Sequence, residues 1–353
     1  MLVETQAPGK LILIGEYVVL EGAPSLVCAV DRYAKVKISE SETEYYLVSA
    51  PSIDIENVPF SITSNGLILF ENSVDMLTRK KLSFFKTTFE YAWQYCKSCR
   101  ITFNPFKIVI DTDAFYSAEL NTKLGFGSSA ALTVALVKAL FKLSGKSPDD
   151  LEELNKIFRL SLAAHKKAQG GLGSGIDIAA SSMGGVLEYR VGINNRAEQL
   201  LPEKVKVWEK LKMLVVFTGS SESTRKMVAG VGQLKKEKPE IYKQLMSDLE
   251  TSSVNGCKAY KKNDISLFFK EIKNYNDLMS SLGEKSGMPI ISPVHQKISE
   301  VVVQSGGVYK PSGAGSGDIG IAFAENAEQI IVVKKAIEKS GFTWLDVKIA
   351  SEH

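Results

Sequence analysis

The chain has 353 residues, of which 44% are hydrophobic and 24% charged, the balance of an ordinary soluble globular protein with room for about two domains. Its 43 basic and 40 acidic residues leave a formal net charge of +3, and no run of lysines and arginines stands out. We therefore expect no nucleic-acid partner, whereas a small anionic ligand remains compatible with this charge.

The N-terminal segment contains an apolar run, Leu11 to Ile14, that is too short for the core of a signal peptide or for a membrane span. We therefore expect a cytoplasmic protein with no membrane partner. The first strands are expected over Lys10 to Ile14 and Tyr33 to Ile38, with a turn-rich connection between them.

Residues 40–104 show little regular pattern apart from an amphipathic helix expected over Leu82 to Tyr95. The polar stretch Asp54 to Asn65 is expected to be a loop. Cys96 and Cys99 form a CxxC pair at the end of this helix, but no second pair or nearby histidine completes a metal set. A structural or incidental role is therefore favoured, and the next strand is expected over Lys107 to Asp111.

The stretch Lys123 to Leu140, KLGFGSSAALTVALVKAL, combines two glycines, two serines and an almost entirely apolar run. Gly125 and Gly127 allow the backbone to bend closely around a ligand, and Ser128 and Ser129 follow where a helix begins. The first turn of a buried helix points unpaired N–H groups and a partial positive charge at one place, which favours phosphate. The alternative is a helix that follows a flexible loop and binds nothing, and the stretch lacks the lysine of a Walker motif.

Beyond this stretch, Ser147 and Pro148 have the pattern of a helix start, and the helix is expected to continue to about Gln169. A second glycine loop, GGLGSGIDIAASSMGG, then leads into a strand over Val186 to Arg190. The segment Asn194 to Lys210 is polar and charged, so we divide the chain there into two domains, 1–200 and 201–353.

The second half begins with a strand over Met213 to Thr218 and continues with helical patterns near 222–234, 240–262, 265–282 and 293–305. A third glycine loop, PSGAGSGD, leads into a strand over Ile319 to Ala324, and the last elements are a helix near 327–340 and a strand near 342–349. Because strands and helices mix without a repeated βαβ pattern, we expect an α+β fold.

Four segments in this order, APGKLILIGEYVVLEG, KLGFGSSAA, GSGIDIA and PSGAGSGD, resemble the GHMP small-molecule kinases over nearly the whole chain. Tyr17 stands where mevalonate kinase and sugar kinases usually have His. This residue, Lys123 before the first loop and the TGSSEST segment are more similar to the phosphomevalonate kinases. The resemblance implies two domains with a cleft between them, the first with a left-handed βαβ crossover and the second ferredoxin-like.

The resemblance also implies ATP- and Mg²⁺-dependent phosphorylation of phosphomevalonate on the mevalonate route to isoprenoid precursors, by a monomer or homodimer. Such a reaction brings two anions together, so positioning and charge neutralisation carry most of the catalysis. Mevalonate kinase, a sugar kinase and diphosphomevalonate decarboxylase remain open within the superfamily. A non-catalytic nucleotide or metabolite sensor is a further alternative, but the joint presence of Lys10, Ser129 and Asp177 argues against it.

The resemblance implies that Lys10 reaches both the transferred phosphoryl group and Asp177. Asp177 lies in a small apolar run, where an unpaired carboxylate is costly to bury, so it requires a cation or ligand nearby. A phosphate monoester is largely deprotonated near neutral pH, so for Asp177 we favour orientation and pairing with Lys10 over proton abstraction. An Asp that caps a helix is the alternative, because Ser174 and Asp177 have a capping-like spacing.

The first glycine loop is assigned to the ATP phosphates, with Ser129 as a ligand of Mg²⁺. Its residues are Gly125, Phe126, Gly127, Ser128, Ser129 and Ala130. The acceptor is assigned to two residues that match the family and to two polar or glycine-rich segments. These residues are Lys123, Ser174, Ser223, Thr224, Arg225, Gly313, Ala314 and Gly315.

Three further positions qualify this assignment. Ser316 departs from the glycine-rich pattern of the third loop, and we expect it to be tolerated with a negative φ. The second protein ligand of the metal stays open, because AAHKKAQGG occupies the region where mevalonate kinase places a Glu. His165 in that segment is interpreted as an ordinary hydrogen-bonded helix residue, and His295 has no supporting neighbours in the sequence.

Overall fold

The computed structural model describes residues 2–98, 104–148, 150–171, 173–192, 201–219 and 224–351. The elements of the first half are β1 (Leu2–Ile14), η1 (Val18–Glu21), β2 (Ser25–Glu40), β3 (Tyr46–Ala50), η2 (Pro51–Ile53), β4 (Ile55–Ile62), β5 (Ile68–Phe70), α1 (Met76–Lys81), α2 (Ser83–Ser98), β6 (Phe106–Asp111), η3 (Asp113–Phe115), β7 (Tyr116–Ser117), β8 (Thr122–Lys123), α3 (Ser128–Leu143), α4 (Leu151–Ala168), α5 (Ile176–Met183), β9 (Val186–Tyr189) and β10 (Glu203–Val205). Those of the second half are β11 (Lys212–Phe217), α6 (Thr224–Glu237), α7 (Pro239–Lys261), α8 (Ile265–Ser286), α9 (Pro293–Gln304), β12 (Val308–Pro311), β13 (Ile319–Ala324), α10 (Ala327–Lys339) and β14 (Thr343–Leu345).

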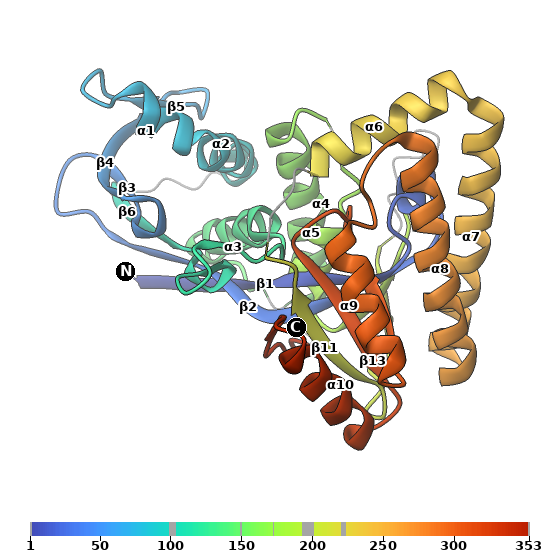
Figure 1. Ribbon diagram of the computed structural model, residues 1–353. Helices are drawn as coiled ribbons and strands as arrows, with labels where there is room; N and C mark the ends of the chain where they lie inside the picture. The colour runs from blue at the N-terminus through green and yellow to red at the C-terminus, as the bar shows by residue number, and fades with distance from the viewer. Residues whose placement is uncertain are drawn as a thin grey trace.

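The larger sheet contains eight strands of the described part, in the order β10-β9-β2-β6-β3-β4-β5, with β1 paired to β2. β1 and β2 form a long antiparallel ladder, and α3 and α5 pack against both (Figure 1). The C-terminal part of β1 is buried on both faces, because Ile12 packs with the helices of the first half and Leu11 and Leu13 pack with the second half. β1 therefore lies between two hydrophobic cores and contributes residues to both.

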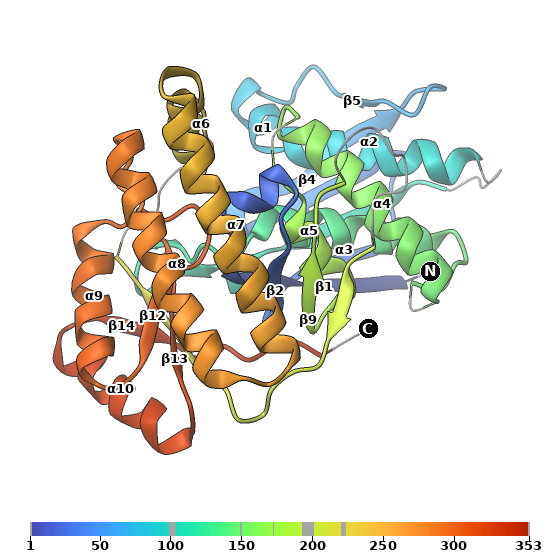
Figure 2. The same ribbon diagram turned by 90° about the vertical axis from the view of Figure 1, so that its right-hand side faces the viewer.

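The smaller sheet has four antiparallel strands of the described part, in the order β12-β13-β11-β14. Helices α9 and α10 cover one face, where Val302 and Val333 pack with Val216. The other face packs against the core that includes α6, α7 and α8. Helices α7 and α8 lie side by side (Figure 2). This strand order is ferredoxin-like, as the resemblance predicts, and the α+β class is confirmed.

The two halves of the chain are connected through the larger sheet as well as through the cavity described below. β10 pairs with β9 at the edge of that sheet, and near the C-terminus Ala350 N–H donates to Ala29 O at 2.9 Å. The domain boundary at residue 200 and the handedness of the crossover stay predictions. Among the described helices, none has both the length and the apolar character that crossing a membrane requires.

The main error of the sequence analysis concerns the polar stretch expected to be a loop, which contains strand β4. Only Ile55 and Phe60 of this strand are buried, and Phe60 stacks on Tyr46 with ring centroids 5.6 Å apart. The outer face of the strand is therefore polar. Its polar residues outnumber the two buried ones, so the sequence pattern resembles that of a loop.

A second error concerns the helix start proposed at Ser147 and Pro148, since α4 begins at Leu151. The Asp150 carboxylate accepts hydrogen bonds from the N–H groups of Glu152 and Glu153 and is therefore the N-cap. The helices predicted in the second half are confirmed with ends shifted by a few residues. Cys99, the segment 193–200 and Ser223 lie outside the described residues.

Candidate active site

A cavity of about 350 Å³ lies where β1, α3, α5, α6 and the loop after β12 meet. It brings together most of the residues assigned to catalysis, ATP and the acceptor from the sequence. These are Lys10, Lys123, Gly125, Phe126, Gly127, Ser128, Ser129, Ser174, Asp177, Thr224, Gly313, Ala314 and Gly315. The three glycine loops, spread over nearly 200 residues of sequence, thus line one site.

Three assigned residues are not part of this lining. Ala130 is buried inside α3, and Ser223 is outside the described residues. Arg225 lies near the edge of the site, where its Nη2 donates to Gln169 O at 3.1 Å. The cavity also includes residues that the sequence analysis did not assign to the site. The polar ones are Glu16, Tyr17, Gln169, Ser312 and Asp318.

Two helices begin at this cavity directly after a glycine. α3 follows Gly127, with φ 79°, and α5 follows Gly175, with φ 81°, and neither glycine can supply a capping oxygen. The free N–H groups at the start of α3 and the positive ends of both helix dipoles favour an anion. In α5, Ile176 N–H already donates to Ser174 Oγ at 3.3 Å and Ile178 N–H to Asp177 Oδ1 at 3.0 Å. A side chain at Gly127 is excluded by its positive φ, and its Cβ would lie 3.4 Å from Lys10 Cγ.

Lys10 is fixed to the first glycine loop through its backbone. Its N–H donates to Phe126 O at 2.9 Å, and a Cβ on the preceding Gly9 would lie only 2.8 Å from the same oxygen. Lys10 and Ile12 are two positions apart on β1, so both side chains face the helix starts. Lys10 and Asp177 both flank Gly127, but these two described side chains form no direct ion pair.

Ser129, His165 and Asp177 form a polar cluster at the start of α3. His165 is buried on α4, and its Nε2 lies 3.2 Å from Ser129 Oγ and 3.9 Å from Asp177 Oδ2. The amide nitrogen of Gln169 also lies 3.2 Å from Nε2 and, because an amide nitrogen donates, it favours the tautomer in which Nε2 is unprotonated. His165 is thus hydrogen-bonded, as expected, and its partners belong to the site.

This cluster fits Mg²⁺ in the presence of a nucleotide. Mg²⁺ takes oxygen ligands and is commonly held by one or two side chains together with substrate phosphates. Ser129 supplies a hydroxyl, and the partly exposed Asp177 carboxylate lies nearby. Within the described residues, no three His, Cys, Asp or Glu side chains gather in a way that would hold a metal ion by themselves.

The residues assigned to the acceptor from the sequence include an exposed lysine and a serine whose carbonyl accepts a hydrogen bond. Lys123 comes from β8, and Ser174 is held because Tyr189 OH donates to its carbonyl at 2.7 Å. The hydroxyl of Tyr17 donates to Ala314 O at 2.5 Å, so the end of β1 is tied to the third loop. Burial, followed by the negative charge of Glu16, raises the pKa of Tyr17, so its hydroxyl stays protonated and remains a donor.

The third loop differs from the sequence expectation at Ser316. Its φ is 73°, not negative, and in this left-handed conformation its N–H donates to Ile290 O at 2.8 Å. His295, for which the sequence offered no neighbours, is buried behind the same loop. Its Nδ1 lies 2.8 Å from Tyr309 OH and its Nε2 3.3 Å from Gly317 O, and burial lowers its pKa to about 4.

Known proteins are similar to this chain in sequence and in structure. The family model described as GHMP kinases N terminal domain matches residues 85–185. The phosphomevalonate kinase of Saccharolobus solfataricus is 27% identical over 350 residues, which cover 98% of this chain and 97% of the relative. The mevalonate kinase of Arabidopsis thaliana is 25% identical over 383 residues, with 97% and 96% covered.

A solved structure supports the fold over the same length. Streptococcus pneumoniae phosphomevalonate kinase in complex with phosphomevalonate and AMPPNP superposes with a TM-score of 0.77 at 22% identity, covering 99% of each chain. The resemblance found in the glycine loops therefore extends from short motifs to the whole architecture. The chain has the GHMP kinase fold, and its residues 85–185 match the N-terminal domain model of that family.

Proposed function

We propose that this kinase transfers the γ-phosphoryl group of ATP to the phosphate of phosphomevalonate, giving diphosphomevalonate and ADP. The observation that carries the proposal is the convergence of the uncapped start of α3, the N-terminal end of α5 and two lysines, Lys10 and Lys123, on one cavity that also contains Asp177. This arrangement supplies several positive groups where two phosphorylated molecules have to meet.

Each part of the cavity has a separate task in this proposal. The N–H groups at the start of α3 hold the ATP phosphates, and Lys10 neutralises the phosphoryl group during its transfer. Mg²⁺, when bound, supplies further positive charge to the phosphates, and Ser129 would be one of its ligands. Asp177 orients the reacting groups and does not abstract a proton, because the acceptor phosphate is already largely ionised near neutral pH.

The choice of a phosphorylated acceptor rests on Lys123 and Tyr17. An acceptor phosphate adds negative charge next to ATP, and Lys123 provides a cation on the acceptor side of the cavity. Tyr17 fills the position of the His found in mevalonate kinase and sugar kinases and uses its hydroxyl to hold the third loop. Mevalonate kinase activity is the second candidate, since the similar proteins include mevalonate kinases as well as phosphomevalonate kinases.

The test is a coupled assay of ADP release with ATP, Mg²⁺ and one acceptor at a time. Phosphomevalonate, mevalonate and galactose are compared at equal concentrations, and ADP release without an acceptor is subtracted. We expect phosphomevalonate to give the highest kcat/KM, by about 100-fold or more if Lys123 contributes a charge-assisted contact. Preferential use of mevalonate would contradict the proposed acceptor. If none of the three acceptors supports ADP release, all three candidate activities are contradicted.

A further inference from the structure

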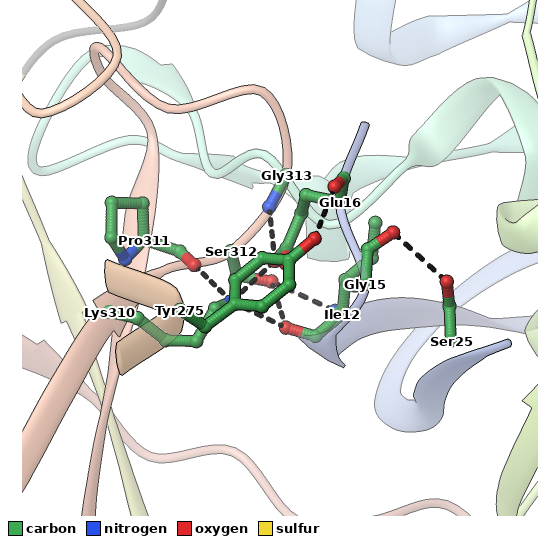
Figure 3. Close-up of polar contacts among 9 residues, drawn as sticks. All are labelled: Ile12, Gly15, Glu16, Ser25, Tyr275, Lys310, Pro311, Ser312 and Gly313. Carbon is green, nitrogen blue, oxygen red and sulfur yellow. Dashed lines mark hydrogen bonds and ion pairs between the residues drawn. The ribbon is translucent and has the colours of Figure 1, made fainter. Parts of the chain in front are cut away.

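A buried ion pair joins the two halves of the chain beside the cavity. Lys310 on β12 is fully buried, Glu16 after β1 is only 2% exposed, and Lys310 Nζ contacts Glu16 Oε1 (Figure 3). The same Nζ donates to Pro311 O at 2.5 Å and to Ile12 O at 3.4 Å. The ammonium group is therefore surrounded by acceptors that come from both halves.

Stability alone is a poor explanation for this pair. Removing two charges from water costs about as much as their attraction returns, and apolar pairs of similar volume are often equally stable. The position of Glu16 points to a role in the site, because its side chain lines the cavity and its Oε1 accepts from Gly313 N–H at 3.3 Å. Among the described residues, its other oxygen, Oε2, is buried and has no hydrogen-bond partner.

Lys10 and this carboxylate both lie next to Gly313 in the third loop. Its Nζ is 3.8 Å from the point that a Cβ on Gly313 would occupy, while Gly313 N–H itself contacts Glu16. The charge of Lys10 also contributes to the lowered pKa of Lys310, after the larger effect of burial, so both ammonium groups act on the same small region. A buried carboxylate in that region attracts whichever of the two cations is available.

We propose that Lys310 is a positioning residue that occupies Glu16 and thereby leaves Lys10 free to bind the phosphoryl group of ATP. Without Lys310, the carboxylate of Glu16 turns to Lys10 and withdraws it from the phosphates. The inference rests on the proposed phosphoryl transfer, but it does not depend on which acceptor is used.

The test compares Lys310→Met, Glu16→Gln and the double variant with the unchanged protein, using whichever acceptor the unchanged protein phosphorylates. Lys310→Met keeps the side-chain volume and leaves Glu16 uncompensated, so we expect kcat and kcat/KM for ATP to fall together by about 100-fold. In the double variant no carboxylate competes for Lys10. We therefore expect kcat within about fivefold of Glu16→Gln and well above that of Lys310→Met.

A simple brace between the halves predicts a different pattern, because the double variant would then be no more active than Lys310→Met. That result, or full activity of Lys310→Met, overturns the inference. If Lys310→Met does not fold, the comparison of the double variant with Glu16→Gln decides alone, and a further loss of about 100-fold overturns the inference.

Two controls keep the outcomes apart. Glu271→Gln changes a buried carboxylate that accepts from Ser252 Oγ at 2.8 Å and does not line the cavity, so its kcat should equal that of the unchanged protein. Thermal unfolding of every variant separates loss of fold from loss of activity. Absence of activity in the unchanged protein with every acceptor contradicts the proposed function instead, and that is established before any variant is measured.

Discussion

Two walls of the cavity provide positive charge in different ways. On one wall, the start of α3 offers backbone N–H groups that need only a glycine before the helix, and the N-terminal end of α5 adds its helix dipole. On the other wall, Lys310 pairs with Glu16, and both Glu16 Oε1 and Lys10 Nζ lie next to Gly313. The first wall is set by local sequence and cannot be switched off by one neighbour, whereas the second depends on a balance of charges contributed by both halves.

The largest expected effect concerns Asp177, in the first turn of α5. Asp177→Asn keeps the shape but removes the charge that orients the reacting groups, so we expect kcat to fall by about 100-fold or more with a modest change in KM. Steady-state kinetics measures this. An unchanged kcat would remove Asp177 from the catalytic residues. Nucleotide binding by the variant would show that the wall formed by the helix starts is intact.

The next prediction concerns Lys123 on the acceptor side. Lys123→Met should raise KM for phosphomevalonate by about 10- to 100-fold, because a charge-assisted contact with the acceptor phosphate is lost, while KM for ATP changes little. Lys35→Met is the matched control, since Lys35 is an exposed lysine that does not line the cavity. Equal effects on both substrates would assign Lys123 to the shared phosphate site instead.

A smaller effect is expected from His295 behind the third loop. Burial lowers its pKa to about 4, below the ordinary value of 6.5, so the unfolded chain binds a proton that the folded chain does not. The stability is therefore complete above pH 6.5 and is lost as the pH falls to about 4, by up to roughly 3 kcal/mol. Unfolding in denaturant at several pH values should show this loss, and His295→Gln should reduce it.

The smallest effect is expected for Tyr17→Phe. The change removes the hydrogen bond to Ala314 O that ties the third loop to the end of β1, which contributes about 1 kcal/mol. Thermal unfolding should shift by a few degrees and kcat should stay within about threefold. A loss of activity as large as that of Asp177→Asn would mean that Tyr17 acts on the substrate directly.

The first wall was predictable because its chemistry is local. Gly127, the two serines after it and the apolar run of α3 lie within one short stretch, and both the helix start and its burial follow from those residues. The second and third loops were found in the same way. The expectation that the three loops meet at one site came from the family resemblance, because no single segment indicates it.

The second wall was not predictable from the same kind of pattern. Glu16 and Lys310 are 294 positions apart, and each is an ordinary charged residue in its own segment. A weak signal existed, since Glu16 stands in a largely apolar run, where a carboxylate needs a partner. The positive φ of Ser316 and the strand β4 were missed for a related reason, because contacts with Ile290 and Tyr46 set them from elsewhere in the chain.

The central claim is that the cavity joins a phosphoryl group to a second phosphate. Phosphorus NMR of a reaction mixture with ATP, Mg²⁺ and phosphomevalonate tests it directly, because the product contains a new diphosphate linkage. If the proposed reaction takes place, the phosphomonoester signal decays while two coupled diphosphate signals of the product and those of ADP grow in equal amounts. A phosphomonoester signal that persists, while mevalonate offered in its place becomes phosphorylated, would contradict it.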